Sequence, residues 1–209
     1  KNDIFQSHLA DPGRLEELLL PGAKLFVLRA PINSKRNTKY STVLVEYKDQ
    51  LISLVSTLPN QFVKDAIGKN FLPMLKNLVY IRSEISIKKH RIDFLFQTNK
   101  GEKFFLEVKS VTFVEKNIAK FPDAVTTRGK NHVDLLRSLM EEGHEAGILF
   151  VCQRSDANMF EPMVDRDPAF SSALVKAYKK GVKVWCITLN INQTEITFNR
   201  EIPVNLVHK

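Results

Sequence analysis

Two carboxylates and a lysine fall on stretches that the sequence predicts to be neighbouring strands. The stretch RIDFLFQ, residues 91–97, alternates between two faces and carries Asp93. The next apolar stretch, KFFLEVKSV, residues 103–111, carries Glu107 and Lys109 two positions apart. Residues i and i+2 of a strand point to the same face, so Glu107 and Lys109 are expected to lie side by side.

These three residues would suit metal-assisted hydrolysis of a phosphodiester. A hairpin would bring Asp93 and Glu107 to within about 5 Å of each other, and two such anions repel unless a cation neutralises them. Mg²⁺ or Mn²⁺ held by both carboxylates could bind a phosphate oxygen and lower the pKa of a bound water. Lys109 could then orient that water or neutralise developing charge. The spacing alone favours the alternative, a solvated Glu107–Lys109 ion pair on a surface strand pair.

Flanking segments offer further candidates for catalysis. Glu84, on the preceding predicted strand, could add a third acidic group or be an ordinary exposed glutamate. At 100° per residue, Arg128 and His132 share one face with the leucines of a helix that ends at Gly143, which directs both toward the sheet. The alternatives are a core histidine at 132 and a structural ion pair between Arg128 and Asp123.

The charge balance makes a polyanion a plausible partner. The chain has 31 Lys and Arg against 23 Asp and Glu, a net charge of 31 − 23 = +8. Basic residues gather in a loop between two predicted strands and beside a hairpin turn, where they could contact a nucleic-acid backbone or simply be solvated: Lys35, Arg36 and Lys39, then Lys88, Lys89 and Arg91.

Several classes of protein are excluded by missing motifs. The sequence has no phosphate-binding G-x-x-x-x-G-K loop, no dinucleotide fingerprint, no G-x-S-x-G elbow and no Cys/His spacing typical of zinc. No apolar run reaches the ~18–20 residues that a membrane span needs, and the first residues lack a signal-peptide core. We therefore expect a cytoplasmic protein with no membrane partner.

The secondary-structure elements that must position these residues predict an α/β (α+β) fold. The predicted fold has two parts that join near residue 58. The first part predicts a helix over 12–20 with Asp11 as its cap, then three strands, for which an OB-like barrel is one candidate. The second part predicts a helix from Asn60, three antiparallel strands, and then helices alternating with strands. That order indicates a mixed sheet with helices on its faces.

The stretches LADPGRLEELLLPG, RIDF, FFLEVKSVTF and FPDAVTTRGKNH, in this order, closely resemble the sugar fermentation stimulation protein (SfsA) family over nearly the whole chain. The resemblance implies an OB-like nucleic-acid-binding domain over 1–58, with Arg14 as a binding residue. It implies a PD-(D/E)XK (restriction-endonuclease-like) domain over 59–209, with Asp93, Glu107 and Lys109 in the motif positions. It also implies DNA binding linked to sugar (maltose) metabolism. Ile92 replaces the proline of the motif's name.

Two hypotheses follow. The first is a Mg²⁺- or Mn²⁺-dependent nuclease that hydrolyses DNA, or alternatively RNA. The second is a non-catalytic DNA-binding regulator of sugar fermentation genes that keeps the nuclease shape. The intact triad favours the nuclease, since a pure binding module gains nothing from two carboxylates that repel the phosphate backbone. Either form is compatible with a homodimer.

Overall fold

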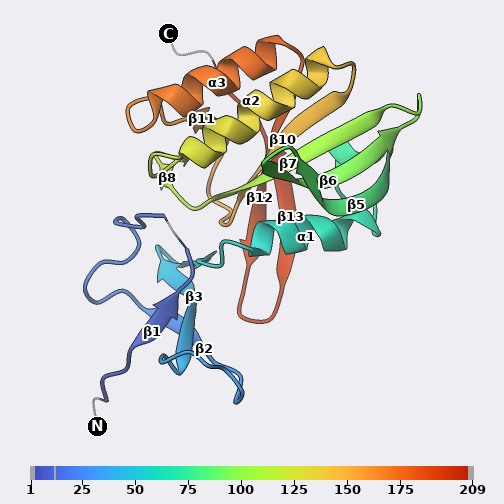
Figure 1. The fold of residues 1–209 in the computed structure, drawn as a ribbon. Coiled ribbons are helices and arrows are strands. Elements are labelled where there is room, and N and C mark those ends of the chain that lie inside the picture. The colour runs from blue at the N-terminus through green and yellow to red at the C-terminus, as the bar shows by residue number, and fades with distance from the viewer. Residues whose placement is uncertain (1–2, 12, 207–209) are drawn as a thin grey trace.

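The computed structural model describes residues 3–11 and 13–206, which form a small N-terminal sheet and a larger layered C-terminal part (Figure 1). The N-terminal strands are β1 (Ser7–Leu9), β2 (Leu25–Arg29), β3 (Tyr40–Tyr47) and β4 (Gln50–Ser53). β2 runs antiparallel to β3 along one edge, while β1 and β4 pair with the two ends of the other edge. The result is an open OB-like sheet and not a closed barrel.

The helix predicted over 12–20 is wrong for the residues that the structure describes. From Gly13 to Leu20 the chain makes only turns, and the backbone amides of Leu18 and Leu19 both donate to the carbonyl of Leu15. Leu15 has a positive φ of 50°, which a helix cannot contain. Leu15 and Leu18 are buried with Val45, so burial of these leucines against the sheet outweighs their helix propensity.

The C-terminal part is built on the predicted mixed sheet, which has six strands in the order β13-β12-β10-β7-β6-β5. Pairing is antiparallel from β5 to β7, parallel from β7 through β10 to β12, and antiparallel at β13. These strands are β5 (Leu78–Ile87), β6 (His90–Thr98), β7 (Lys103–Val111), β10 (Glu145–Cys152), β12 (Lys183–Ile191) and β13 (Ile196–Ile202).

Helices cover both faces of this sheet. α2 (Thr127–Glu141) and α3 (Pro168–Lys179) pack on one face, and α1 (Leu58–Ile67) with a short 3-10 turn, η1 (Pro73–Leu75), lies on the other (Figure 1). The predicted cap of the last helix is confirmed, because Asp167 accepts a hydrogen bond from the Phe170 amide at 2.9 Å. A three-stranded sheet absent from the sequence prediction contains β8 (Val114–Glu115), β9 (Ile118–Phe121) and β11 (Met159–Pro162).

The pairing of β6 with β7 stops short at one end. The paired residues run from Phe94–Leu106 to Gln97–Lys103, so Asp93 lies just outside the ladder. Its carboxylate replaces the missing strand partner, because Asp93 Oδ2 accepts a hydrogen bond from the Val108 amide at 2.7 Å. The two strands therefore part beside Asp93, and the sequence-predicted residues Asp93, Glu107 and Lys109 line this opening.

The two parts of the chain contact each other at the far end of β3. The guanidinium of Arg154 lies 5.2 Å from the ring centroid of Tyr47, and the Ser53 amide donates to the Gln153 carbonyl at 3.3 Å. The Arg14 amide donates to Asp123 Oδ2 at 3.1 Å. Among the residues that the structure describes, no helix is both long enough and apolar enough to cross a membrane.

Candidate active site

A cleft of about 800 Å³ opens where β6 and β7 part. Its walls come from the start of α1, from β5, β6 and β7, and from the first turn of α2. Asp93, Glu107 and Lys109 all line it, as the strand alternation predicts, together with Glu84, Arg91 and Arg128. Of the sequence-predicted catalytic residues, His132 alone is not a lining residue.

Asp93 is held in place through both of its oxygens. Oδ1 accepts from the Asn60 side-chain amide of α1 at 2.7 Å, and Oδ2 accepts from the Val108 amide. Burial is the main cause that raises the pKa of Asp93 to about 6, and the nearby Glu107 carboxylate adds to the shift. The protein therefore keeps a carboxylate at a position where its negative charge is costly.

Glu107 forms the floor of the cleft and is only 2% exposed. Its Oε1 is 2.5 Å from Lys109 Nζ and also contacts His132 Nδ1. Burial disfavours the charged form, but Lys109 and His132 outweigh it and hold the pKa of Glu107 below its ordinary value. Its Oε2 is buried and has no hydrogen-bond partner within residues 3–11 and 13–206. One oxygen of an ionised, buried carboxylate is thus left for a ligand.

His132 is placed by the face of α2 that the helical spacing indicates. The ring is buried, 3% exposed, and its T-shaped contact with His90 has a centroid separation of 5.7 Å. The helix begins at the cap that Thr126 provides to the Gly129 amide at 2.9 Å. His132 therefore contacts the cleft through Glu107, and its catalytic role stays a prediction.

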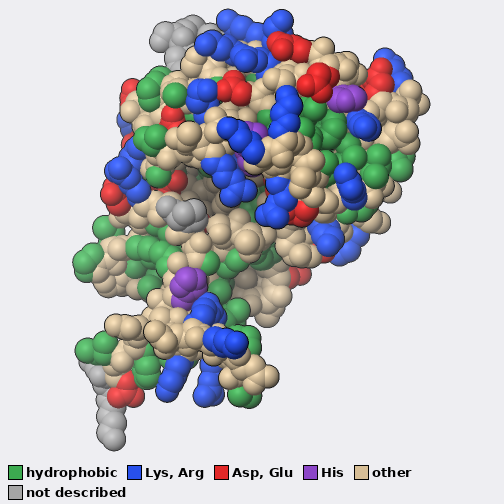
Figure 2. Space-filling model, in the orientation of Figure 1, with side chains coloured by type: hydrophobic (Ala, Val, Ile, Leu, Met, Phe, Trp, Pro, Cys, Tyr) green, Lys and Arg blue, Asp and Glu red, His purple; other side chains and the backbone are tan. Residues whose placement is uncertain are grey.

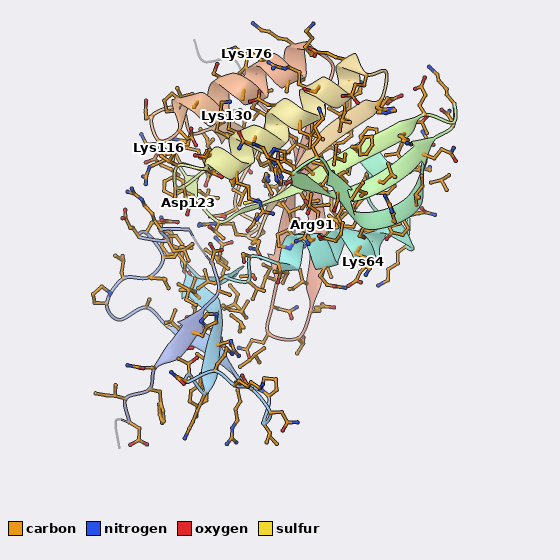
Figure 3. All side chains as sticks on the ribbon, viewed as in Figure 1. Lys64, Arg91, Lys116, Asp123, Lys130 and Lys176 are labelled. Carbon is orange, nitrogen blue, oxygen red and sulfur yellow. The ribbon has the colours of Figure 1, made fainter. Side chains whose placement is uncertain are left out.

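The mouth of the cleft carries basic side chains. Arg128 is exposed at the start of α2, and Lys64 lies on α1 (Figure 3). Arg91 Nε lies 2.5 Å from Glu84 Oε2, and both side chains are more than half exposed. Glu84 has a positive φ of 58°, and its carboxylate pairs with Arg91. Figure 2 shows Lys and Arg side chains gathered across this face of the molecule.

The remaining predicted nucleic-acid-binding residues do not converge on the cleft. Lys35, Arg36 and Lys39 occupy an exposed loop before Tyr40, at the opposite end of β3 from the junction with the C-terminal part. Lys88 and Lys89 form the exposed turn between β5 and β6, and Arg14 is exposed at the junction. Contact of these residues with nucleic acid stays a prediction.

Sequence reasoning missed the contribution of α1. Asn60 holds Asp93, and Lys64, four residues later, lines the same wall of the cleft. The i and i+4 spacing of two polar residues opposite Phe62 and Val63 signals a polar helix face. It does not signal which part of the chain that face meets.

An open OB-like sheet, joined to a mixed sheet whose parting strands present Asp93, Glu107 and Lys109, defines a protein of the restriction-endonuclease-like class. The family models agree with this class. Residues 2–54 match "SfsA N-terminal OB domain" and residues 57–195 match "Sugar fermentation stimulation protein RE domain". The chain belongs to the sugar fermentation stimulation protein (SfsA) family.

Its relatives extend over most of the chain. The sugar fermentation stimulation protein homolog of Clostridium tetani is 35% identical over 98% of this chain and 89% of its own length. The homolog of Chloroflexus aurantiacus is 38% identical over 96% of this chain and 77% of its own. The structure of Pyrococcus furiosus SfsA in complex with Ca²⁺ superposes with a TM-score of 0.88 at 26% identity, covering 98% of this chain and 87% of that one.

Proposed function

We propose that the protein is a divalent-metal-dependent nuclease that hydrolyses phosphodiester bonds in DNA. The observation that carries this proposal is the Oε2 oxygen of Glu107, which is buried, belongs to an ionised carboxylate and has no partner in the part of the chain that the structure describes. Leaving such an oxygen unpaired costs on the order of 1–3 kcal/mol or more, and a cation bound by this carboxylate would remove that cost.

The residues fit a hard divalent cation. Asp93 and Glu107 supply carboxylate oxygens from adjacent strands, and the described residues contain no cluster of three His, Cys, Asp or Glu side chains that could form an all-protein cage. Mg²⁺ and Mn²⁺ suit such a site, because Mg²⁺ usually takes one or two carboxylates and completes its shell with water and substrate phosphate. Support comes from the P. furiosus relative, whose structure was solved with Ca²⁺.

The reaction divides among residues of this chain. A bound cation would supply Lewis acidity toward a phosphate oxygen and would lower the pKa of water. Lys109, whose side chain is 14% exposed, is placed to donate to the attacking water or to a non-bridging phosphate oxygen. Asn60 and the Val108 amide fix the orientation of Asp93, and His132 fixes that of Glu107. Lys64, Arg91 and Arg128 would hold the flanking phosphates at the mouth.

The proposal is tested by a cleavage assay on single-stranded, duplex and branched DNA with Mg²⁺, Mn²⁺ or EDTA. Glu107→Gln keeps the shape of the side chain, and Glu102→Gln, on the exposed turn before β7, is the matched control. We expect metal-dependent cutting by the native protein and the control, and none by Glu107→Gln. Binding without cutting on every substrate would instead establish the non-catalytic regulator.

A further inference from the structure

A second, smaller cavity lies between the N-terminal sheet and the C-terminal part. It measures about 140 Å³ and is lined by four segments of the chain, three of which contribute Asp11 and Gly13, Ser110 and Thr112, and Asp123. Figure 3 labels Asp123 on the side of the C-terminal part that faces the N-terminal sheet. These three segments belong to the stretches LADPGRL, EVKSVTF and FPDAVTT, and the proposed hydrolysis uses none of these five residues. We call this cavity the inter-domain pocket.

The inter-domain pocket adjoins the catalytic cleft. Ser56 lines both cavities, and Ser110 directly follows Lys109 on β7. The two cavities are therefore neighbours. For a nucleic-acid strand whose phosphate lies over Asp93 and Glu107, this neighbouring pocket is within reach of the adjacent nucleotide.

One wall of the pocket presents carboxylate oxygens. Asp11 Oδ1 accepts from the Gly13 amide at 2.7 Å, and Asp123 Oδ2 accepts from the Arg14 amide at 3.1 Å. The second oxygen of each carboxylate has no partner among the described residues. The missing side chain of Gly13 keeps space open between the two carboxylates, because an added Cβ would lie 2.9 Å from Asp11 Oδ1 and closer still to Asp123 Oδ2.

The wall formed by β7 presents hydroxyl groups. Thr112 is 5% exposed, and its hydroxyl has no hydrogen-bond partner in the described part of the chain. Ser110 Oγ accepts from the Gln153 side-chain amide at 2.8 Å, so its own proton is free to be donated. Lys120, which also lines the pocket, is committed to Glu115 at 2.7 Å. The pocket thus combines two anionic acceptors with two neutral hydroxyls.

The two carboxylates and two hydroxyls indicate which chemical groups a ligand of the pocket must carry. Carboxylates without a cationic partner accept hydrogen bonds from N–H donors. The pKa of Asp11 is raised, mainly by burial and also by the nearby Asp123 carboxylate, which is expected where no cation balances the negative charge. The hydroxyls can donate to a ring nitrogen or a carbonyl oxygen. Cytosine carries both features on one edge, and Asp or Glu is the usual acceptor for its 4-amino group. A cavity of about 150 Å³ holds one six-membered ring, so a pyrimidine fits the inter-domain pocket better than a purine.

We infer that the inter-domain pocket binds an unpaired cytosine base next to the scissile phosphate. The inference rests on the proposed function for the position of the strand. The base must be unpaired, because the amino edge that Asp11 and Asp123 would receive is the edge used in base pairing. Nucleic acid with exposed single-stranded cytosine is then the preferred substrate.

The test measures binding of the full chain to single-stranded oligothymidylates in EDTA by fluorescence anisotropy, which needs neither metal nor cleavage. The oligonucleotides carry at one position cytosine, thymine, an abasic site, or 2-pyrimidinone, which is cytosine without the amino group. We expect cytosine to bind about tenfold more tightly than the other three. Equal affinity for all four would overturn the inference with the native protein alone, whatever any variant does.

Substitutions in the inter-domain pocket test whether this pocket causes the preference for cytosine. Asp123→Asn keeps an oxygen for the Arg14 amide but replaces an acceptor by a donor, and Gly13→Ala fills the pocket; both are expected to lose the cytosine preference. Asp49→Asn, on the exposed turn between β3 and β4, should retain it. A preference untouched by Asp123→Asn would refute the site.

The two proposals fail separately. Metal-dependent cutting with no cytosine preference removes the pocket and leaves the nuclease. A cytosine preference without cutting keeps the pocket and removes the nuclease. Absence of binding to every oligonucleotide removes the pocket, and the cleavage assay on duplex and branched DNA then decides the nuclease by itself.

Discussion

Two clusters of buried charge in this molecule are built in opposite ways. At the junction, Arg154 is 1% exposed and each of its three guanidinium nitrogens has a partner, with two contacts of 2.7 Å to Asp156 and one of 3.3 Å to the Thr112 carbonyl. In the cleft, Glu107 is equally buried but keeps Oε2 unpaired within the described residues. Complete pairing stabilises a fold, whereas an incomplete set leaves a place for a ligand. Glu107 therefore differs from Arg154 in having a buried polar atom that a ligand could complete.

Lys109→Ala is expected to have the largest effect on the cleft. We expect cleavage to fall by at least about a hundredfold, because the cation nearest the reacting phosphate is lost. Binding to the same DNA should stay within about threefold, since Lys64, Arg91 and Arg128 still line the mouth. Lys103→Ala, on the exposed start of β7, is the matched control for both measurements. Equal losses of binding and cleavage would remove Lys109 from the chemistry.

Arg154→Met tests the other cluster. The substitution leaves Asp156 and the Thr112 carbonyl without their shared donor and removes the contact with Tyr47. We expect the free energy of unfolding to fall by about 3 kcal/mol or more, measured by urea denaturation. Arg82→Ala, exposed on the edge strand β5, should change it by less than about 0.5 kcal/mol. A small effect of Arg154→Met would mean that complete pairing does not mark a structural charge here.

The pH dependence of metal binding examines the cleft alone. Asp93 must be ionised to bind a cation, and its pKa of about 6 lies in an accessible range. Below pH 6 a proton competes with the metal, so apparent Mn²⁺ affinity should fall about tenfold per pH unit. Above pH 6 the affinity should be nearly constant, since the lowered pKa of Glu107 adds no second proton there. Calorimetry between pH 4.5 and 7.5 gives the slope, and a flat profile contradicts the role of Asp93 as a ligand.

The smallest expected change is that of Asn60→Ala. The Asn60 amide stabilises the ionised form of Asp93, so its loss should weaken Mn²⁺ binding at pH 7 by about tenfold. Asn99→Ala, in the exposed turn between β6 and β7, serves as the control. If the affinity of Asn60→Ala equals that of the control, Asn60 does not position Asp93 for the metal.

The sequence alone predicts the part of the site that depends on strand alternation. Asp93, Glu107 and Lys109 meet because period-2 alternation and short links place them on one hairpin. Asn60 could not be found this way, since its contact depends on how α1 packs against the sheet. The false helix over 12–20 has the same cause, because caps and propensity are local whereas the burial of Leu15 against β3 is not.

The interrupted ladder at Asp93 also gives the molecule a natural reporter. The Val108 amide points toward β6 but finds a carboxylate oxygen there instead of a backbone carbonyl. Its proton resonance therefore senses the charge on Asp93 directly. One amide signal in a nitrogen–proton correlation spectrum can follow protonation and cation loading of the cleft, in the native chain and with no label attached to the site.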